Sequence, residues 1–264
     1  MTEAHFQDIL FEKKDGIAKI TINRPEKYNC FRAVTAREMT LAFEDAGNDP
    51  KIGVIVLTAS GTKAFCTGGD GKDVGPSGAG YNPDLLVWIE KLHGLIRTVP
   101  KPVIASVRGY AIGGGNVLAT LCDLTIASEN AVFQQVGPKV GSYDAGWGAI
   151  QLISAVGEKK AREIWYLCRP YKATEGLQMG LVNKVVPDAQ LEAETEAWCK
   201  ELLEKSPTAL KFLKASMTAV TAQLSGLDRS YFHHLWLYYQ SEEAVEGRKA
   251  FEEKRKPDFG KFRA

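Results

Sequence analysis

Residues 109–116 read Gly-Tyr-Ala-Ile-Gly-Gly-Gly-Asn, and this glycine-rich stretch is the most informative part of the sequence. It follows an apolar run at 102–107 that is typical of a strand, and it leads into a helical pattern at 117–122. Glycine at a strand-to-helix turn lets backbone N–H groups approach a ligand, and the helix N-terminus favours negative charge there. The stretch therefore predicts a strand–turn–helix unit with a site at its turn.

A second glycine cluster, Ala-Phe-Cys-Thr-Gly-Gly-Asp, occupies residues 64–70 and follows another strand-like run at 52–59. Two such turns could supply two N–H donors to one developing oxyanion, a contribution of ~3–4 kcal/mol per donor. The alternative is that the glycines only permit tight turns or close helix packing, and the residues alone leave both interpretations open. Neither cluster fits the dinucleotide fingerprint GxGxxG, so a Rossmann domain is not indicated.

Strands and helices alternate along the first part of the chain, which favours an α/β core with a parallel, helix-covered sheet. The predicted strands lie at 16–23, 52–59, 102–107, 124–128 and 181–186. The predicted helices lie at 34–46, 117–122, 158–167 and 173–180. From about Ala189 the pattern becomes helical, at 191–205, 209–222 and 230–253. We therefore predict a core over 1–190 and a helical region over 191–264 that packs on a neighbour or caps the site.

The charge balance argues against two classes of partner. The chain of 264 residues has 33 basic and 32 acidic side chains, a net charge of +1, so neither nucleic acid nor an anionic membrane is expected as a main partner. No run approaches the roughly 18 apolar residues of a membrane span, and the first residues lack an apolar signal stretch. Basic residues that matter should act locally, on a phosphate or a carboxylate.

The five cysteines are scattered and form no CxxC pair, which argues against a disulfide framework and a structural zinc site. The four histidines show no metal-ligand spacing with acidic partners. We therefore expect no metal, and we predict a cytoplasmic protein.

Together the clusters resemble the crotonase (enoyl-CoA hydratase/isomerase) superfamily over nearly the whole chain. The stretches that carry the resemblance are NRPEKYN (23–29), AFCTGGD (64–70), KPVIA (101–105), GYAIGGG (109–115), CDL (122–124), and Glu246-Gly247 leading to FEEKR (251–255). The resemblance implies a spiral of ββα turns with a C-terminal helical trimerisation region, assembled as a homotrimer or a dimer of trimers. It also implies an oxyanion hole for a thioester carbonyl, made by the N–H groups of Gly69 and Gly114.

Coenzyme A enters as part of the substrate, and the resemblance implies no separate cofactor. Lys27, the strand around Ala64, and Phe251 and Lys254 of a neighbouring subunit match positions that bind CoA in the family. The full set of positions that the resemblance assigns to substrate binding is Lys27, Ala64, Gly68, Asp70, Tyr81, Gln135, Gly137, Trp165, Phe251 and Lys254.

The positions that match the two catalytic glutamates of the family's hydratases hold Val117 and Gly137. Neither residue transfers a proton, so simple hydration of an enoyl-CoA is disfavoured. Residues 132–148, VFQQVGPKVGSYDAGWG, instead resemble two narrower groups, 2-ketocyclohexanecarboxyl-CoA hydrolase and 1,4-dihydroxy-2-naphthoyl-CoA synthase. In both groups Ser142 and Asp144 match residues at the reacting acyl group, and Tyr239 matches a tyrosine from the helical tail. Without the resemblance, Ser142 would be read as a turn residue and Tyr239 as a core aromatic.

The stretch after the first glycine cluster distinguishes the two groups. The synthase carries an arginine there, whereas residues 71–76 read GKDVGP, and Lys72 lacks the bidentate fork of arginine. Residues 113–120 and 251–257 are also more similar to the hydrolase. The expected function is therefore hydrolytic ring opening of a cyclic β-oxoacyl-CoA, with ring closure by a synthase as the alternative.

The expected mechanism assigns one role to each residue. Asp144 activates water, Ser142 orients it, the N–H groups of Gly69 and Gly114 hold the enolate, and Tyr239 donates a proton to carbon or a hydrogen bond to the ketone. By analogy with a bicarbonate in the synthase, a bound water or small anion is expected near Gln135. A non-catalytic RNA-binding or scaffold homologue is the rival from another class, and the near-neutral charge and intact acidic and hydroxyl positions count against it.

Overall fold

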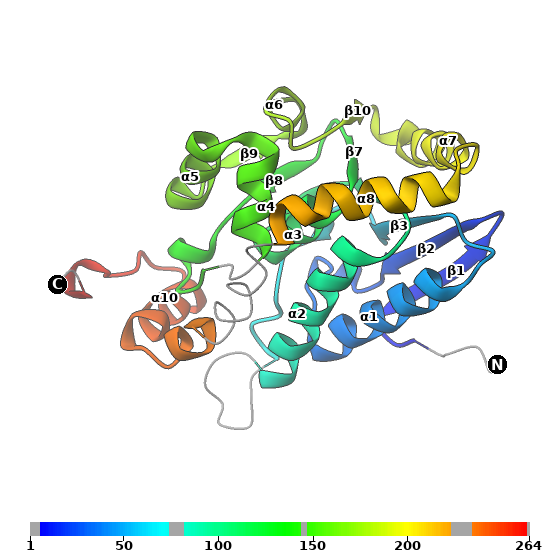
Figure 1. Ribbon diagram of the computed structural model, residues 1–264. Helices are drawn as coiled ribbons and strands as arrows, with labels where there is room; N and C mark the ends of the chain where they lie inside the picture. Colours follow the sequence, from blue (N-terminus) through cyan, green and yellow to red (C-terminus); the bar gives the residue numbers. More distant parts are fainter. Residues whose placement is uncertain (1–5, 74–81, 144–146, 223–233, 263–264) are drawn as a thin grey trace.

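A computed structural model describes residues 6–73, 82–143, 147–222 and 234–262 of the chain (Figure 1). The strands of these residues form two sheets, with the orders β1-β2-β3-β5-β7-β10 and β4-β6-β8-β9. The strands of the larger sheet are β1 (Ile9–Lys14), β2 (Ile17–Ile22), β3 (Val54–Ala59), β5 (Val103–Val107), β7 (Leu124–Ser128) and β10 (Lys184–Val186).

The larger sheet confirms the predicted parallel core. β2, β3, β5, β7 and β10 pair in parallel, and β1, which the sequence analysis did not predict, pairs with β2 in antiparallel fashion. Asp15 and Gly16 form the two-residue turn between β1 and β2, both with positive φ, 51° and 82°. Such a turn matches the right-handed twist of the two strands, which is why an Asp-Gly pair lies at this tip.

The smaller sheet was not predicted from the residues alone. Its strands are three residues long, too short to show an alternation of apolar and polar side chains: β4 (Ala64–Cys66), β6 (Tyr110–Ile112), β8 (Val132–Gln134) and β9 (Pro170–Lys172). Three of them follow strands of the larger sheet, and the units β3-β4-α2 and β5-β6-α3 each end in a helix. This repeat of two strands and a helix confirms the ββα spiral that the resemblance implied.

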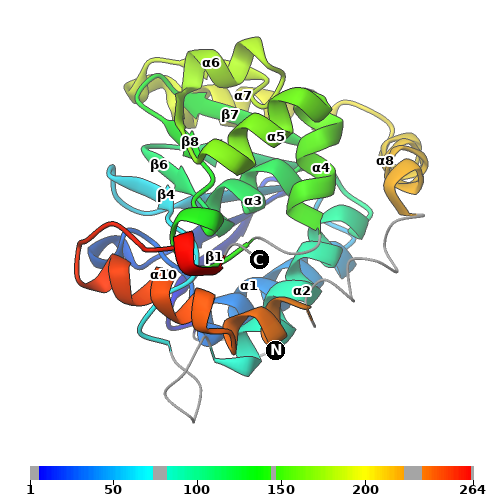
Figure 2. The same ribbon diagram turned by 90° about the vertical axis from the view of Figure 1, so that its left-hand side faces the viewer.

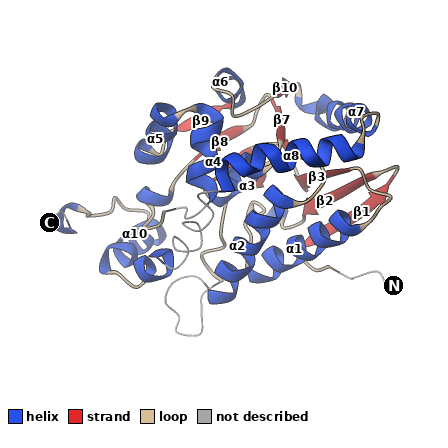
Figure 3. Ribbon diagram, viewed as in Figure 1, coloured by secondary structure: helices blue, strands red, loops and turns tan. Residues whose placement is uncertain are grey.

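Helices cover both faces of the larger sheet (Figures 1 and 3): α1 (Ala33–Asn48) and α2 (Pro83–Thr98) on one face, and α7 (Leu191–Leu203) on the other. The side chains of β3 alternate between these faces. Val54 and Val56 pack in one cluster with Leu191 of α7, while Ile55 and Leu57 belong to the main core. The first helix of the predicted C-terminal region therefore packs directly on the sheet.

The remaining helices of the core are α3 (Gly114–Leu121), α4 (Trp147–Val156), α5 (Glu158–Leu167) and α6 (Ala173–Gln178). α3 and α6 pack on the smaller sheet, α4 packs on α3, and α5 packs on α4. The predicted strand over 181–186 was wrong at its start, since β10 begins at Lys184. The N–H groups of Leu181 and Val182 donate instead to the Gly176 carbonyl, at 2.9 and 3.1 Å, and close the end of α6.

The C-terminal region continues with α8 (Pro207–Ala222), helical residues 234–239 and α10 (Glu242–Glu252). The predicted continuous helix over 230–253 was wrong, because the Ser241 side chain caps a new helix by accepting the Ala244 N–H at 3.2 Å. Figure 2 shows α8 along one side of the molecule, away from α10. In the ranges that the structure describes, no helix is long and apolar enough to cross a membrane.

The contact between α3 and β4 gives a stability prediction. Gly115→Ala is expected to lower the free energy of unfolding by about 1–3 kcal/mol, because the added Cβ would overlap the Cys66 carbonyl and push the two elements apart. The matched control is Gly94→Ala on α2, where a Cβ meets no described atom within 4 Å and alanine stabilises the helix by up to about 1 kcal/mol. Urea unfolding measures both variants, and equal stability would contradict this contact.

Candidate active site

The two glycine turns lie in direct contact. β4 and β6 pair in parallel, with Cys66 opposite Ala111, so the turns that follow them lie side by side. Gly68 has a positive φ of 87°, and a Cβ added to Gly114 would lie 3.4 Å from the Gly68 Cα. Gly115 packs against the Cys66 carbonyl. A Cβ on Gly114 would also lie 2.6 Å from the Phe31 ring, so close packing, one of the two interpretations of these glycines, applies to Gly68, Gly114 and Gly115.

The N–H groups of Gly69 and Gly114 bear on the other interpretation, the supply of two donors to one oxyanion. Phe31 forms a parallel bridge with Gly69 that uses the N–H groups of Phe31 and Asp70, at 2.9 and 2.8 Å, and not that of Gly69. α3 begins at Gly114, so its N–H lies in the first turn, where N–H groups have no intrahelical acceptor. Within the described residues neither N–H donates a hydrogen bond, and both glycines are partly exposed. Two adjacent backbone donors of this kind suit an oxyanion.

An ion pair holds the first glycine turn in place. The Arg24 guanidinium donates to Asp70 at 2.9 Å and to the Cys30 carbonyl at 2.6 Å, and the Lys72 N–H donates to the other oxygen of Asp70 at 3.1 Å. Burial raises the pKa of Asp70, but the hydrogen bonds from Lys72 and Arg24 outweigh it, so the pKa is lowered and the carboxylate stays charged. The structure thus gives Asp70 partners within the chain, and Arg24, to which the sequence analysis gave no role, positions the residue after Gly69.

Ser142 and Tyr239 lie 97 residues apart in the sequence, and their hydroxyl oxygens are 2.8 Å apart. Tyr239 belongs to the helical residues 234–239 and is only 6% exposed. Beside this pair, the rings of Tyr143 and Tyr238 meet edge to face at 5.6 Å. The structure therefore joins the two hydroxyls that the sequence analysis placed in one site, whereas Asp144 lies outside the described residues.

Two glycines allow the tail to approach the loop that carries Ser142. A Cβ on Gly247 of α10 would overlap the Gly141 backbone nitrogen, and a Cβ on Gly141 would lie 3.0 Å from the Gly247 Cα. The loop itself folds back on its start, since the Ser142 N–H donates to the Gly137 carbonyl at 2.8 Å. Its first residues adjoin the second glycine turn, where the Gly113 N–H donates to the Gln134 carbonyl at 2.8 Å.

The positions of the two hydratase glutamates are both filled by close packing. Val117 is 1% exposed, and a Cβ added to Gly148 on α4 would lie 2.7 Å from a methyl group of Val117. A Cβ on Gly137 would lie 2.9 Å from the Ser142 carbonyl oxygen and 3.0 Å from the Tyr143 Cα. Neither position carries a carboxylate, and a side chain at Gly137 would require a shift of the backbone at Ser142 and Tyr143.

Gln135 and Trp165 carry buried polar atoms that need a partner. They are 1% and 9% exposed, and within the described residues the Gln135 Oε1 and the Trp165 Nε1 have no hydrogen-bond partner. Buried polar groups of this kind are commonly satisfied by an ordered water. Each atom could be satisfied by a water, and the water or small anion expected near Gln135 stays a prediction.

The predicted CoA-binding residues lie toward the surface, with one exception. Lys27 in the short helix η1 (Pro25–Lys27) is exposed, as are Phe251, at 69%, and Lys254. Ala64 is 3% exposed, and its carbonyl accepts the Asn29 side chain at 2.7 Å. Tyr81 lies outside the described residues.

Hydrogen bonds to the Glu246 carboxylate, here called the clamp, hold the residues that follow α10 in place. The sequence analysis did not predict them. The Arg255 guanidinium makes two hydrogen bonds to the Glu246 carboxylate, at 2.6 and 3.0 Å, and the Asp258 N–H donates to the same carboxylate at 2.8 Å. The bonds from Arg255 and Asp258 hold the pKa of Glu246 at about 2. The clamp fixes the turn at Lys254, whose φ is +54°, and presents Phe251 and Lys254 outward.

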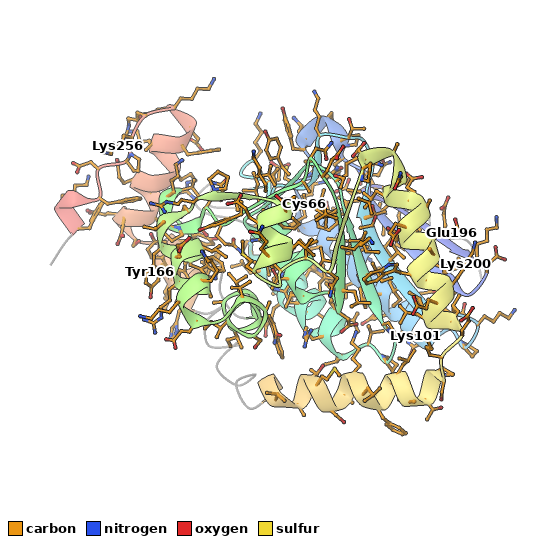
Figure 4. All side chains as sticks on the ribbon, turned by 90° about the horizontal axis from the view of Figure 1, so that it is seen from above. Cys66, Lys101, Tyr166, Glu196, Lys200 and Lys256 are labelled. Atoms are coloured by element: carbon orange, nitrogen blue, oxygen red, sulfur yellow. The ribbon has the colours of Figure 1, made fainter. Side chains whose placement is uncertain are left out.

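The site offers no thiol nucleophile at the first glycine turn. Cys66 lies in the interior (Figure 4), and burial raises the pKa of its thiol to about 12, so it stays protonated at neutral pH. No group of three metal-binding side chains occurs in the ranges that the structure describes.

Comparisons with known proteins agree with this fold. The model of the enoyl-CoA hydratase/isomerase family matches residues 12–262. An enoyl-CoA hydratase from Mycobacterium avium subsp. paratuberculosis is 29% identical over 97% of this chain and 99% of its own, with a TM-score of 0.86. A carnitinyl-CoA dehydratase from Mycobacterium avium is 30% identical over 95% and 98%, with a TM-score of 0.83. An enoyl-CoA hydratase from Bacillus anthracis is 26% identical over 96% and 98%, with a TM-score of 0.76.

Proposed function

The chain belongs to the enoyl-CoA hydratase/isomerase family of the crotonase superfamily, and we propose that it opens the ring of a cyclic β-oxoacyl-CoA by hydrolysis. The coarser activity, the processing of an acyl-CoA thioester, follows from membership of the family. The proposed substrate carries a ring ketone next to the α-carbon of the thioester. The product is a ring-opened dicarboxylic mono-thioester.

The observation that carries the proposal is the 2.8 Å contact between the Ser142 and Tyr239 hydroxyls. A β-oxoacyl group has a second carbonyl that needs hydrogen-bond donors of its own, apart from those that hold the thioester oxygen. The hydroxyl pair can supply one such donor, because one of its two O–H groups donates within the pair. The glycine turns supply the N–H groups of Gly69 and Gly114 to the thioester oxygen. The loop that carries Ser142 begins beside the second of these turns, through the bond between Gly113 and Gln134.

The proposed reaction uses one water molecule. Asp144 accepts a proton from the water as its oxygen bonds to the ring ketone carbon. The bond between this carbon and the α-carbon then breaks, and its electron pair forms the thioester enolate, held by Gly69 and Gly114. Tyr239 protonates the α-carbon and regains a proton from Asp144 through Ser142, and the new carboxylic acid ionises. A free carbanion would be a very poor leaving group, so the step depends on the oxyanion hole.

The packing of Val117 and Gly137 separates this proposal from hydration, the activity that the solved relatives' names state. Hydration of crotonyl-CoA is expected to be negligible beside ring opening, because neither position carries a carboxylate that could transfer a proton. Steady-state rates on crotonyl-CoA and on 2-ketocyclohexanecarboxyl-CoA measure the difference. A hydration rate equal to the ring-opening rate would make this protein a hydratase with relocated acid–base groups.

Exposed apolar residues on α8 support the proposed assembly as a homotrimer or a dimer of trimers. Phe212, Leu213, Met217 and Val220 are 62%, 53%, 67% and 77% exposed. A helix that leaves such side chains in water is typical of a subunit interface. The clamped tail would then offer Phe251 to the CoA of a neighbouring subunit.

Ring closure by a synthase is the second candidate, and the buried Gln135 and Trp165 favour it. Their unsatisfied acceptor and donor fit the small anion that the synthase resemblance implies. Incubation with succinylbenzoyl-CoA distinguishes the two, since a synthase forms a naphthoyl thioester without consuming water.

A further inference from the structure

Phe31 contacts both glycine turns of the candidate active site. Its backbone forms the bridge with the first turn, where its N–H donates to the Gly68 carbonyl at 2.9 Å and its carbonyl accepts the Asp70 N–H at 2.8 Å. Its ring packs against the second turn, since a Cβ added to Gly114 would lie 2.6 Å from the ring Cζ and 3.0 Å from a ring Cε. One buried residue, 5% exposed, therefore touches the segments that carry both proposed oxyanion donors.

The bridge also fixes the direction of the Gly69 N–H. The Gly68 carbonyl and the Gly69 N–H belong to one planar peptide unit, and in a trans unit such as this one they point in opposite directions. Because the carbonyl points at the Phe31 N–H, the Gly69 N–H points away from Phe31. The Gly114 N–H is fixed in the same way. The Gly113 carbonyl accepts a helical N–H of α3 at 3.0 Å, so the Gly114 N–H points out of the start of that helix.

Two arginines hold the segment around Phe31 from either side. The Arg24 guanidinium donates at 2.6 Å to the carbonyl of Cys30, the residue before Phe31. Arg32, the residue after it, donates to both oxygens of Asp8 at 2.8 and 2.9 Å. The Arg24 Nε also lies 3.7 Å from the Asp8 carboxylate, so one buried carboxylate, 3% exposed, faces both cations. Charged groups that the proposed chemistry does not use therefore fix the backbone at Phe31.

We propose that Phe31 is a positioning residue for the acyl-CoA reaction, which sets the spacing of the two N–H donors and is itself held in place by Arg24. Phe31 offers no group to the chemistry, so its effect passes through Gly69 and Gly114. Donors of this kind act only when they are aimed at the developing oxyanion, and a displacement of about 1 Å costs about 10²-fold in rate. The proposal rests on the oxyanion hole of the proposed function, but not on the ring-opening step.

The test is the infrared band of the thioester carbonyl in butyryl-CoA that carries an isotope label at the carbonyl carbon. Butyryl-CoA is saturated and acyclic, so it can be neither hydrated nor ring-opened. Binding to the full-length wild-type protein should shift the band to lower wavenumber, because two hydrogen bonds to the oxygen weaken the C=O bond. Phe31→Leu should lose most of this shift, since leucine ends at Cδ and lacks the ring atoms that meet Gly114.

Positioning also predicts a division between turnover and binding. In Phe31→Leu the turnover number for ring opening should fall by about 10²-fold, because the donors are displaced from the oxyanion. The Kd for butyryl-CoA and the KM should change little, because the contacts to the CoA part of the ligand stay in place.

Phe43→Leu is the matched control. Phe43 is a fully buried phenylalanine about three turns into α1, so the substitution removes the same atoms from the same core at a distance from the bridge. It should keep the full band shift. Arg24→Gln removes one of the two arginines and leaves the ring, so it serves where Phe31→Leu fails to fold, and it should also lose the shift.

A full band shift in whichever of Phe31→Leu and Arg24→Gln folds would overturn the proposal. An equal loss in Phe43→Leu would overturn it too, since the core would then be loosened as a whole. So would an unshifted band in the wild type, because the two N–H groups would not hold the thioester oxygen. Ring opening is measured separately, from the product of 2-ketocyclohexanecarboxyl-CoA. A wild-type shift that Phe31→Leu loses, in a protein that leaves this substrate intact, would support the positioning role and refute ring opening alone.

Discussion

Asp144→Asn is expected to lower the turnover number for ring opening by about 10²–10⁴-fold, the usual loss when a positioned general base is removed. Asparagine keeps the shape and the hydrogen-bonding capacity of the side chain but cannot accept the proton of the attacking water. The KM should change little, since the contacts to the CoA part of the substrate and the proposed oxyanion hole supply most of the binding. Steady-state kinetics on 2-ketocyclohexanecarboxyl-CoA measure both quantities.

Asp84→Asn, at an exposed carboxylate in the first turn of α2, is the control and should retain wild-type turnover. Near-normal ring opening by Asp144→Asn would refute the assigned base. A group bound near Gln135 would then be the candidate for that role.

Tyr239→Phe is expected to slow ring opening by about 10²-fold or more, because it removes the proposed proton donor. Ser142→Ala should slow it as well, since in the proposed reaction Ser142 passes the proton to Tyr239. The two hydroxyls are 2.8 Å apart, so their effects should not add, and the double variant should be close to the slower single one. A double-mutant cycle measures this coupling as a difference of turnover numbers.

Deuterium incorporation into the product supplies an independent readout of the Tyr239 role. Exchange of the α-hydrogen with deuterated solvent should slow in parallel with turnover in Tyr239→Phe. Tyr238→Phe is the matched control, because it removes a hydroxyl from the adjacent residue and leaves the Ser142 contact intact. Wild-type turnover in Tyr239→Phe, or additive effects of the two substitutions, would remove Tyr239 from the reaction.

The larger sheet could be predicted from the sequence because its strands are long and apolar. Residues 52–59 form a continuous apolar, β-branched run, a local pattern typical of a strand buried on both faces, although the division of Val54 and Val56 from Ile55 and Leu57 appears only in the structure. The smaller sheet could not be predicted from residues, since strands of three residues carry no period. The break before α10 was missed because Ser241 caps a helix inside a stretch whose composition favours helix throughout.

The candidate site was predicted only through the resemblance. The contact between Ser142 and Tyr239 joins residues 97 positions apart, and no local pattern encodes it. The clamp between Glu246 and Arg255 was missed for a similar reason, since charged side chains near the end of a helix usually face water. The glycine turns were the exception, because the glycines themselves mark where the chain must come close to itself.

The central claim is that this site adds water across a ring carbon–carbon bond, and one measurement tests it most directly. 2-Ketocyclohexanecarboxyl-CoA is incubated with the protein in heavy-oxygen water, and the product is analysed by mass spectrometry. We expect a ring-opened dicarboxylic mono-thioester, heavier than the substrate by one water, with the heavy oxygen in the new carboxylate. Recovery of the intact cyclic thioester, under conditions in which the protein hydrates crotonyl-CoA, would contradict the claim.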